Sequence, residues 1–342
     1  MCACCSNVRR LIFLSVYYVQ GVEFTGTPYL GKTFSNLYQA NITYPFTKTK
    51  SIRFSTGVRS DNTVVFADVI DASTQFSLKF PNQKTLYSMS KLEFVYDNSL
   101  NMAQNIWHGE RAKIYAEWNR QINKDITQDG PNTFNFGFDG RYYHSIYRNF
   151  IWAGRVAGDF SFGDQKLIYY LGGVDGWLMF GANQKANGAD RYFNTNNPPS
   201  SAENYSFQSL AVNMRGFIQN IANGSNSLVI NSEFRLPVFT TIFDRTINSS
   251  FIRNFQVTQF IDLGTAWNGS FDKIKRPEAS YFTGGATTVR VKAGGIGPLA
   301  GGYGFGARTS VFGYFVKFDK SWQMNGFFKG KAQNYFSLGL DF

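Results

Sequence analysis

The feature that most constrains the fold is a repeated alternation of apolar and polar side chains with a period of two residues. In segment 51–59, one face carries Ile, Phe, Thr and Val, and the other carries two arginines, two serines and a glycine. Segments 111–119, 134–139 and 228–238 repeat the pattern, with charged, amide or glycine residues opposite aromatic and aliphatic ones. Successive side chains of a strand point to opposite faces of a sheet. The pattern therefore predicts an all-β protein built from two-faced strands.

Two architectures can use such strands. In a soluble sandwich the polar face meets water and the apolar face meets a second sheet, whereas in a membrane barrel the apolar face meets lipid and the polar face lines the lumen. Aromatic residues make up 18% of the chain, and 33 glycines stand against 9 prolines, which favours strands joined by turns. The mean hydropathy of −0.24 fits either architecture, because only half of each strand is apolar. No apolar run approaches the roughly 18 residues of a membrane helix.

An arginine and an aspartate point to a closed barrel with an inserted loop. Asp262 lies on the polar face of the predicted strand Phe260–Gly264, and an unpaired carboxylate away from water is costly. Arg215, in the irregular segment Arg215-Gly216-Phe217, can supply a bidentate partner if its loop folds back onto that strand. We expect Gly216 to allow close backbone approach and Phe217 to pack inside the barrel.

The predicted connections include two long segments rich in Asn, Gly and Ser. The first runs from Gly172 to Gln208 and leads toward Arg215, and the second runs from Gly269 to Gly302. The first is too long for a structureless loop in a compact domain, and we therefore expect it to be functional.

The last strand carries Phe336, Leu338, Leu340 and Phe342 on one face and stops on an aromatic residue. A barrel uses such a strand to close against its first strand and so to remove an open edge. A buried terminal strand of a soluble sheet is the alternative.

The first residues differ from the rest of the chain. Cys2, Cys4 and Cys5 are its three cysteines, and they lack the fourth ligand and the spacing of a metal site. Arg9-Arg10 followed by an apolar run has the outline of a signal peptide, but no small-residue cleavage site follows. We therefore treat residues 1–20 as a separate segment, a truncated start or a weak signal, and residues 21–342 as one β-barrel domain.

Taken together, these motifs resemble the C-terminal barrel of the BamA/TamA outer-membrane assembly superfamily, the bacterial surface antigen family. Arg215-Gly216-Phe217 resembles its Val-Arg-Gly-Phe/Tyr motif, with Met214 in place of Val, and Phe260-x-Asp262-x-Gly264 resembles its inner-wall motif. Glu233, Arg235 and Pro237 resemble the strand after the loop, and Leu171-Gly172-Gly173 the strand before it. The resemblance extends from about Thr33 to Phe342 and is strongest after Ile168. The loop from Trp177 to Gln208 is similar to Bacteroidetes-type versions.

The resemblance implies a transmembrane antiparallel barrel of about 16 strands with a loop folded into the lumen. It implies that Arg215 and Asp262 hold this loop, and that the barrel inserts proteins into the outer membrane or translocates them through a lateral seam between its first and last strands. It also implies periplasmic POTRA domains upstream, outside this 342-residue sequence. Expected partners are outer-membrane lipid, including anionic lipopolysaccharide, and unfolded outer-membrane or secreted client proteins.

Two other classes of function remain open. A stand-alone pore or receptor barrel would use lumen charges such as Arg53, Lys91, Glu93, Asp97 and Lys113 to set its selectivity. An outer-membrane enzyme would need a catalytic constellation, yet the only histidines, His108 and His144, have no convincing serine or carboxylate partner. We expect no enzyme activity, cofactor or metal. The net charge of +11 is spread along the chain without a nucleic-acid-binding motif, so we expect no nucleic acid as a partner.

Overall fold

A computed structural model describes most of the chain. The described residues are 9–13, 17–19, 22–24, 29–65, 68–71, 76–78, 83–102, 105–122, 130–179, 192–194, 197–243, 247–282, 288–311 and 314–339. The three cysteines, Leu340 and Phe342 lie outside these ranges. The division of the chain at residue 20 stays a prediction.

Among the described residues, one antiparallel sheet of 14 strands forms most of the structure, where the resemblance implies a barrel of about 16. Its strands follow the order β1-β4-β5-β8-β10-β11-β12-β16-β17-β21-β22-β23, and β9 and β20 pair beside this path with β10 and β21. The bounds are β1 (Arg9–Phe13), β4 (Tyr29–Pro45), β5 (Lys50–Val65), β8 (Gln83–Asp97), β9 (Leu100–Met102), β10 (Asn105–Gln121), β11 (Asn132–Tyr147), β12 (Phe150–Gly163), β16 (Asn226–Pro237), β17 (Gln256–Trp267), β20 (Gly295–Ile296), β21 (Leu299–Val311), β22 (Tyr314–Gln323) and β23 (Gln333–Leu338).

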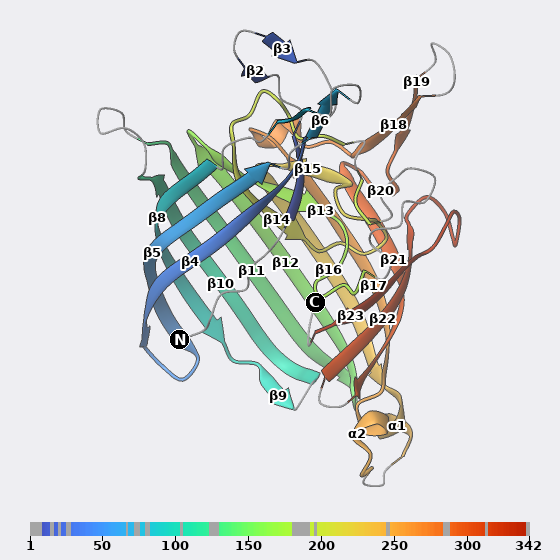
Figure 1. Ribbon diagram of the computed structural model, residues 1–342. Coiled ribbons are helices and arrows are strands. Elements are labelled where there is room, and N and C mark those ends of the chain that lie inside the picture. The colour runs from blue at the N-terminus through green and yellow to red at the C-terminus, as the bar shows by residue number, and fades with distance from the viewer. Residues whose placement is uncertain are drawn as a thin grey trace.

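The sheet curves into a barrel wall, so that its first strands and its last strands come to the same side of the molecule (Figure 1). Neighbouring strands pair in simple antiparallel register, for example Asn231 of β16 opposite Asp262 of β17. β1 and β23 are the two ends of the strand order. Within the described residues, no pairing joins β23 to β1 or β4, and the closing role predicted for the last strand stays a prediction.

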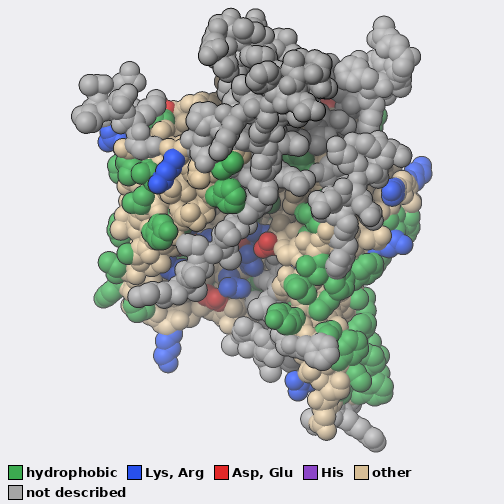
Figure 2. All heavy atoms as spheres, viewed as in Figure 1, with side chains coloured by type: hydrophobic (Ala, Val, Ile, Leu, Met, Phe, Trp, Pro, Cys, Tyr) green, Lys and Arg blue, Asp and Glu red, His purple; other side chains and the backbone are tan. Residues whose placement is uncertain are grey.

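The wall has its charged side chains inside and its aromatic side chains outside. Phe54 of β5 and Trp118 of β10 are 43% and 42% exposed, whereas Arg59 and Asn119 on the opposite faces of these strands are buried. Figure 2 shows hydrophobic side chains along the outer wall and charged side chains within the opening. The alternation predicted from the sequence is therefore confirmed, and it belongs to a barrel wall instead of a sandwich.

Between β12 and β16 the chain leaves the wall and folds into the lumen. There β13 (Lys166–Leu171) pairs with β14 (Tyr205–Val212) in parallel and with β15 (Ala222–Gly224) in antiparallel orientation. β13 contacts β11, β12, β16 and β17, which places it against the inner wall (Figure 1). A buried apolar cluster fills the space between them and consists of Leu171, Met214, Phe217, Ala222, Val229, Ala266, Ala293 and Ala300.

Short hairpins and helices lie at the two ends of the barrel. Three hairpins lie at the upper end in Figure 1: β2 (Tyr17–Val19) with β3 (Val22–Phe24), β6 (Asp68–Asp71) with β7 (Phe76–Leu78), and β18 (Glu278–Phe282) with β19 (Thr288–Lys292). α1 (Val238–Ile242) and α2 (Ser250–Arg253) connect β16 to β17 at the lower end. No helix in the described part of the chain is long and apolar enough to cross a membrane.

The segment Gly269–Gly302, predicted as an irregular connection, is more ordered than expected. It contains the single-turn helix η1 (Phe271–Lys273), the β18–β19 hairpin and the tight β20–β21 hairpin. Strand β21 already begins at Leu299. Part of the glycine-rich composition that favours a loop here is instead used within a strand, because Gly302 of β21 faces the inserted loop at Arg215.

Candidate functional site

The inserted loop brings Arg215 to the inner wall through a short backbone bridge. Met214 pairs with Gly173, whose carbonyl accepts a hydrogen bond of 2.9 Å from the Met214 N–H. The bridge joins the start of the loop to its end, so that the chain re-enters the lumen beside β13. Arg215, the next residue, then points toward β16 and β17.

Arg215 and Asp262 form the bidentate pair that the sequence predicts. The Arg215 Nε and Nη2 atoms donate to the two carboxylate oxygens of Asp262 at 2.7 and 2.9 Å, and the Arg215 backbone N–H donates to the same carboxylate at 3.0 Å. Asp262 is 1% exposed and Arg215 is 6% exposed. Three charge-assisted hydrogen bonds without competing water fix both the position and the orientation of the loop.

Glu233 of β16 extends this pair into a network. Its carboxylate accepts a hydrogen bond from Arg215 Nη1 at 2.8 Å and another from Arg235 Nε at 2.7 Å, and it also pairs with Arg308 of β21. Glu233 is fully buried. We call these five residues, Arg215, Arg235, Arg308, Glu233 and Asp262, the Arg215 cluster. A buried carboxylate is tolerated here because three guanidinium groups replace its water.

The surroundings of Arg215 keep its side chain charged. Burial alone would lower the pKa of Arg215, but the carboxylates of Asp262 and Glu233 raise this pKa well above its ordinary value. Asp319 of β22 adds a third negative charge, with its carboxylate 3.9 Å from Arg215 Nη1. The guanidinium also lies 3.6 Å from the ring centre of Phe260, a cation–π contact.

Gly216 allows the loop to touch the wall backbone to backbone. Its φ of +100° is a left-handed conformation, and a Cβ built there would lie 2.9 Å from the Cα of Gly302. A Cβ built on Gly302 would lie 2.0 Å from the carbonyl oxygen of Arg215. Both positions therefore require glycine, one on the loop and one on β21.

Tyr335 of β23 connects the loop to the last strand. Its hydroxyl accepts a hydrogen bond of 3.0 Å from the Gly216 N–H and donates one of 2.7 Å to the carbonyl of Phe217. The ring of Phe217 is 2% exposed and belongs to the buried apolar cluster. The arginine, the glycine and the phenylalanine of the loop thus each make a separate contact with the wall.

Most of the predicted site residues meet at this place. Arg215, Gly216, Phe217, Phe260, Asp262, Glu233 and Arg235 lie together, and a Cβ built on Gly264 would lie 2.9 Å from the sulfur of Met214. Pro237 lies elsewhere, at the end of β16, where its carbonyl accepts a hydrogen bond from Thr241 of α1. Phe336 and Leu338 are 37% and 38% exposed on the outer face.

Four residues that complete the site were not identified from the sequence: Arg308, Asp319, Gly302 and Tyr335. The spacing of Gly302, Gly304 and Gly306 at every second position is a signal that could have been used. Alternate residues share one face of a strand, so this spacing predicts a face that another segment approaches closely. A Cβ built on Gly304 would lie 2.8 Å from the Phe260 ring.

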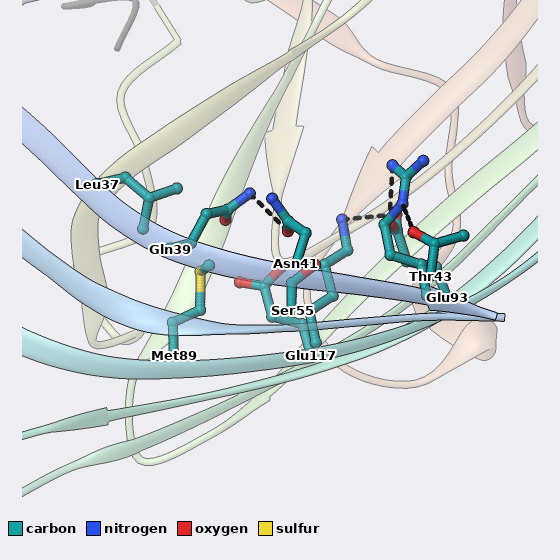
Figure 3. A pocket seen from close by; sticks show the side chains of 10 residues that line it. Leu37, Gln39, Asn41, Thr43, Ser55, Met89, Glu93 and Glu117 are labelled. Atoms are coloured by element: carbon teal, nitrogen blue, oxygen red, sulfur yellow. Dashed lines mark hydrogen bonds and ion pairs between the residues drawn. The ribbon is translucent and has the colours of Figure 1, made fainter. Parts of the chain in front are cut away.

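The first strands enclose a different space. A cavity of about 470 Å³ is lined by inward-facing side chains of β4, β5, β8 and β10 (Figure 3). Among them, Lys91 pairs with Glu93 at 3.1 Å. Gln39 donates a hydrogen bond to Asn41 (Figure 3). This half of the lumen offers polar groups to water or to a ligand.

The described residues contain no group of three or more His, Cys, Asp or Glu side chains placed to hold a metal ion. The rings of His108 and His144 lie 5.8 Å apart between centres, and both residues are exposed.

Comparison with known proteins gives a structural match only. No protein-family model and no curated protein matches the sequence. The crystal structure of BamA from Haemophilus ducreyi lacking POTRA domains 1–3 is similar, with a TM-score of 0.50 and 12% sequence identity. The match covers 90% of this chain and 54% of that chain, so the chain spans about half the length of the BamA protein that it matches. At this identity the match carries the fold alone: the chain has the antiparallel β-barrel fold of BamA.

Proposed function

We propose that this chain is an outer-membrane barrel that assists the insertion or translocation of proteins through a lateral seam between its first and last strands. The observation that carries the proposal is the Arg215 cluster, which ties a lumenal loop to the wall next to β23, one of the two ends of the strand order. An edge strand offers backbone groups to which an incoming strand can add by β-augmentation.

The dimensions and faces of the wall support an outer-membrane location. β4, β5, β8, β10, β11 and β12 contain 14 to 17 residues, more than the roughly 9–11 residues that a tilted strand needs to cross a bilayer. Their exposed faces are aromatic and aliphatic, as lipid contact requires. Outer-membrane lipid, including anionic lipopolysaccharide, is therefore the first proposed partner, and unfolded outer-membrane or secreted proteins are the proposed clients.

We further propose which domains act with this barrel and to which bacterial group it belongs. Periplasmic domains of the POTRA type would act with this barrel, and the composition of the loop Trp177–Gln208 supports a Bacteroidetes-type member of the superfamily. The barrel would act without an enzymatic step, a cofactor or nucleic acid.

Reconstitution tests the proposal directly. The protein is placed in lipid vesicles, and the folding rate of a urea-unfolded outer-membrane barrel is followed by its gel mobility shift. Arg215→Ala is expected to reduce the acceleration severalfold, because the loop is no longer held against the wall. Arg53→Ala, which removes a half-exposed lumen arginine, serves as the control. Wild-type protein that gives no acceleration would count against the function.

A second candidate, a stand-alone pore or receptor barrel, is favoured by the polar cavity beside β4. Charged and polar side chains line it, including Arg53, Lys91, Glu93 and Glu117. Single-channel conductance that survives deletion of the Arg215 loop, together with no client folding, would favour this candidate over the first.

A further inference from the structure

The edge of β23 that faces away from β22 is already paired over three residues. On one side β23 pairs with β22, from Val316 opposite Leu338 to Ser321 opposite Gln333. On the other side, the segment Gly176–Leu178 of the inserted loop runs antiparallel to it, with Trp177 opposite Ser337. We call Gly176–Leu178 the edge-capping segment. It pairs with the strand that ends the sheet, although it belongs to the loop and not to the wall.

The pairing has the hydrogen bonds of a regular antiparallel strand. The Leu178 N–H donates to the carbonyl of Phe336 at 2.8 Å, and the Leu338 N–H donates to the carbonyl of Gly176 at 3.1 Å. These bonds flank Trp177 and Ser337, which makes the two a non-hydrogen-bonded pair with its side chains close together. The segment thus satisfies the backbone groups that an edge strand otherwise offers to a partner.

Trp177 holds the segment against β23 by ring contacts on the lumen side. Its ring lies 4.8 Å from the ring of Tyr335 and 5.0 Å from the ring of Tyr192, both in edge-to-face geometry. Tyr335 is the residue whose hydroxyl bonds Gly216 and Phe217. The edge-capping segment and the Arg215-Gly216-Phe217 segment of the loop therefore contact the same strand through one shared tyrosine.

Gly176 permits the close approach of the two backbones. Its φ is +64°, and a Cβ built there would lie 2.1 Å from the carbonyl oxygen of Leu338. The obstacle is backbone of the strand and not the end of a flexible side chain, so any other residue must push the segment away from β23. A substitution at Gly176 therefore disturbs the edge contact and leaves the other contacts of the loop in place, so it can be used to test the edge contact.

From this geometry we propose that the edge-capping segment is a built-in strand that occupies the docking edge of β23. A client strand must displace Gly176–Leu178 before it pairs with Phe336–Leu338. This inference rests on the proposed function for the identity of the incoming strand. The docking edge itself accepts any extended segment, since the contacts are backbone hydrogen bonds.

A peptide-capture experiment measures the edge without any client assay. Ser337→Cys is introduced after the three native cysteines are replaced by serine, and the barrel is incubated with a synthetic peptide of residues 174–179 that carries cysteine at position 177. Disulfide formation reports docking of the peptide on β23. Gly176→Ala is expected to raise the capture yield about tenfold, since a clash of this size shifts the pairing equilibrium toward an open edge.

Gly297→Ala is the matched control. Gly297 also has a left-handed φ, +55°, but a Cβ built there meets nothing within 4 Å. It therefore imposes a similar backbone cost without touching β23. Equal capture by the Gly176→Ala and Gly297→Ala proteins, at the unaltered level, would overturn the proposal.

A locked barrel tests the consequence for clients. In the cysteine-free background, Trp177→Cys with Ser337→Cys should form an internal disulfide, because non-hydrogen-bonded pairs bring their side chains close. Oxidised protein should accelerate client folding at least about tenfold less than reduced protein. Client folding that is unchanged by oxidation would contradict the capping role. Reduced protein that is inactive on clients would instead count against the proposed function, and the capture result would still decide the capping role.

Discussion

The two halves of the lumen carry similar side chains, but the surroundings of these side chains differ. In the half formed by β12–β23, the inserted loop covers the wall, and Glu233 is fully buried with Arg215, Arg235 and Arg308 around it. In the half formed by β4–β10, Glu93 faces a cavity of about 470 Å³, and its partner Arg53 has a half-exposed side chain. The same alternation of residues gives a rigid charged network beneath the inserted loop and a polar surface that lines a cavity around Arg53.

The difference follows from the access of water to the ion pairs and not from the number or sign of the charges. An exposed ion pair contributes about 0–1 kcal/mol, because water competes with each partner. A buried pair costs several kcal/mol when one partner is removed, because the other charge stays buried without compensation. The inserted loop excludes water from the charged side chains beneath it. Because these charges can then pair only with one another, the position of the loop depends on them.

Arg215→Ala should give the largest contrast between the halves. We expect a loss of about 3–5 kcal/mol in the free energy of unfolding, since Asp262 and Glu233 would both lose a buried partner. Arg53→Ala should cost about 0–1 kcal/mol. Urea unfolding in detergent micelles, followed by tryptophan fluorescence, measures both. Similar losses for the two variants would remove the distinction between the halves.

A double-mutant cycle tests the partnership inside the cluster. Arg215→Ala with Asp262→Ala should cost little more than either change alone, because the two side chains act as one unit. The same urea titration gives all three free energies. Additive losses would mean that Arg215 and Asp262 stabilise the barrel independently.

Gly302→Ala should have the next largest effect. Its Cβ would lie 2.0 Å from the Arg215 carbonyl, and the expected cost of this overpacking is about 1–3 kcal/mol. Gly140→Ala, on β11, is the control, because the nearest atom to its Cβ is 3.9 Å away. Susceptibility of the loop to limited proteolysis gives a second measurement, and it should rise only for Gly302→Ala. Equal proteolysis of both variants would contradict the close approach.

Tyr335→Phe should cost less than Arg215→Ala and no more than Gly302→Ala. It removes two buried hydrogen bonds and leaves the Gly216 N–H and the Phe217 carbonyl with one partner fewer, at about 1–3 kcal/mol. Tyr87→Phe, which loses the 3.3 Å bond to Gln165 and keeps the contact of its ring with Arg59, should cost under about 1.5 kcal/mol. Thermal unfolding monitored by the mobility of unboiled protein on detergent gels compares them. The reverse order would show that Tyr335 does not hold the loop.

Lys91→Ala should change stability least, by under about 1 kcal/mol, because the Lys91 side chain lies at the cavity and is 24% exposed, and Arg53 remains as a cation 3.9 Å from Glu93. Its effect should appear in permeation: the reversal potential in a salt gradient across a planar bilayer should shift toward cation selectivity. An unchanged reversal potential would show that the cavity of β4–β10 lies off any ion path.

Sequence patterns predicted the wall well, for a local reason. A period of two residues decides which face each side chain occupies, and Phe54 outside against Arg59 inside follows from that period alone. The pairing of Arg215 with Asp262 was also predicted, because a lone carboxylate on a polar strand face calls for a cation nearby. Glu233 was identified as part of a strand motif, but its role as partner of three arginines was not.

The sequence by itself determined the strands, their two faces and the arginine that holds the loop. Only the tertiary structure decided which parts of the wall that loop meets. Four residues, Arg308, Asp319, Gly302 and Tyr335, join the site because the strand order places β21, β22 and β23 in succession after β17. Gly176–Leu178 meets β23 because the loop folds back across the lumen. Side-chain periodicity is a property of neighbouring residues, whereas these contacts depend on strand order, register and the path of a long loop, which no local pattern encodes.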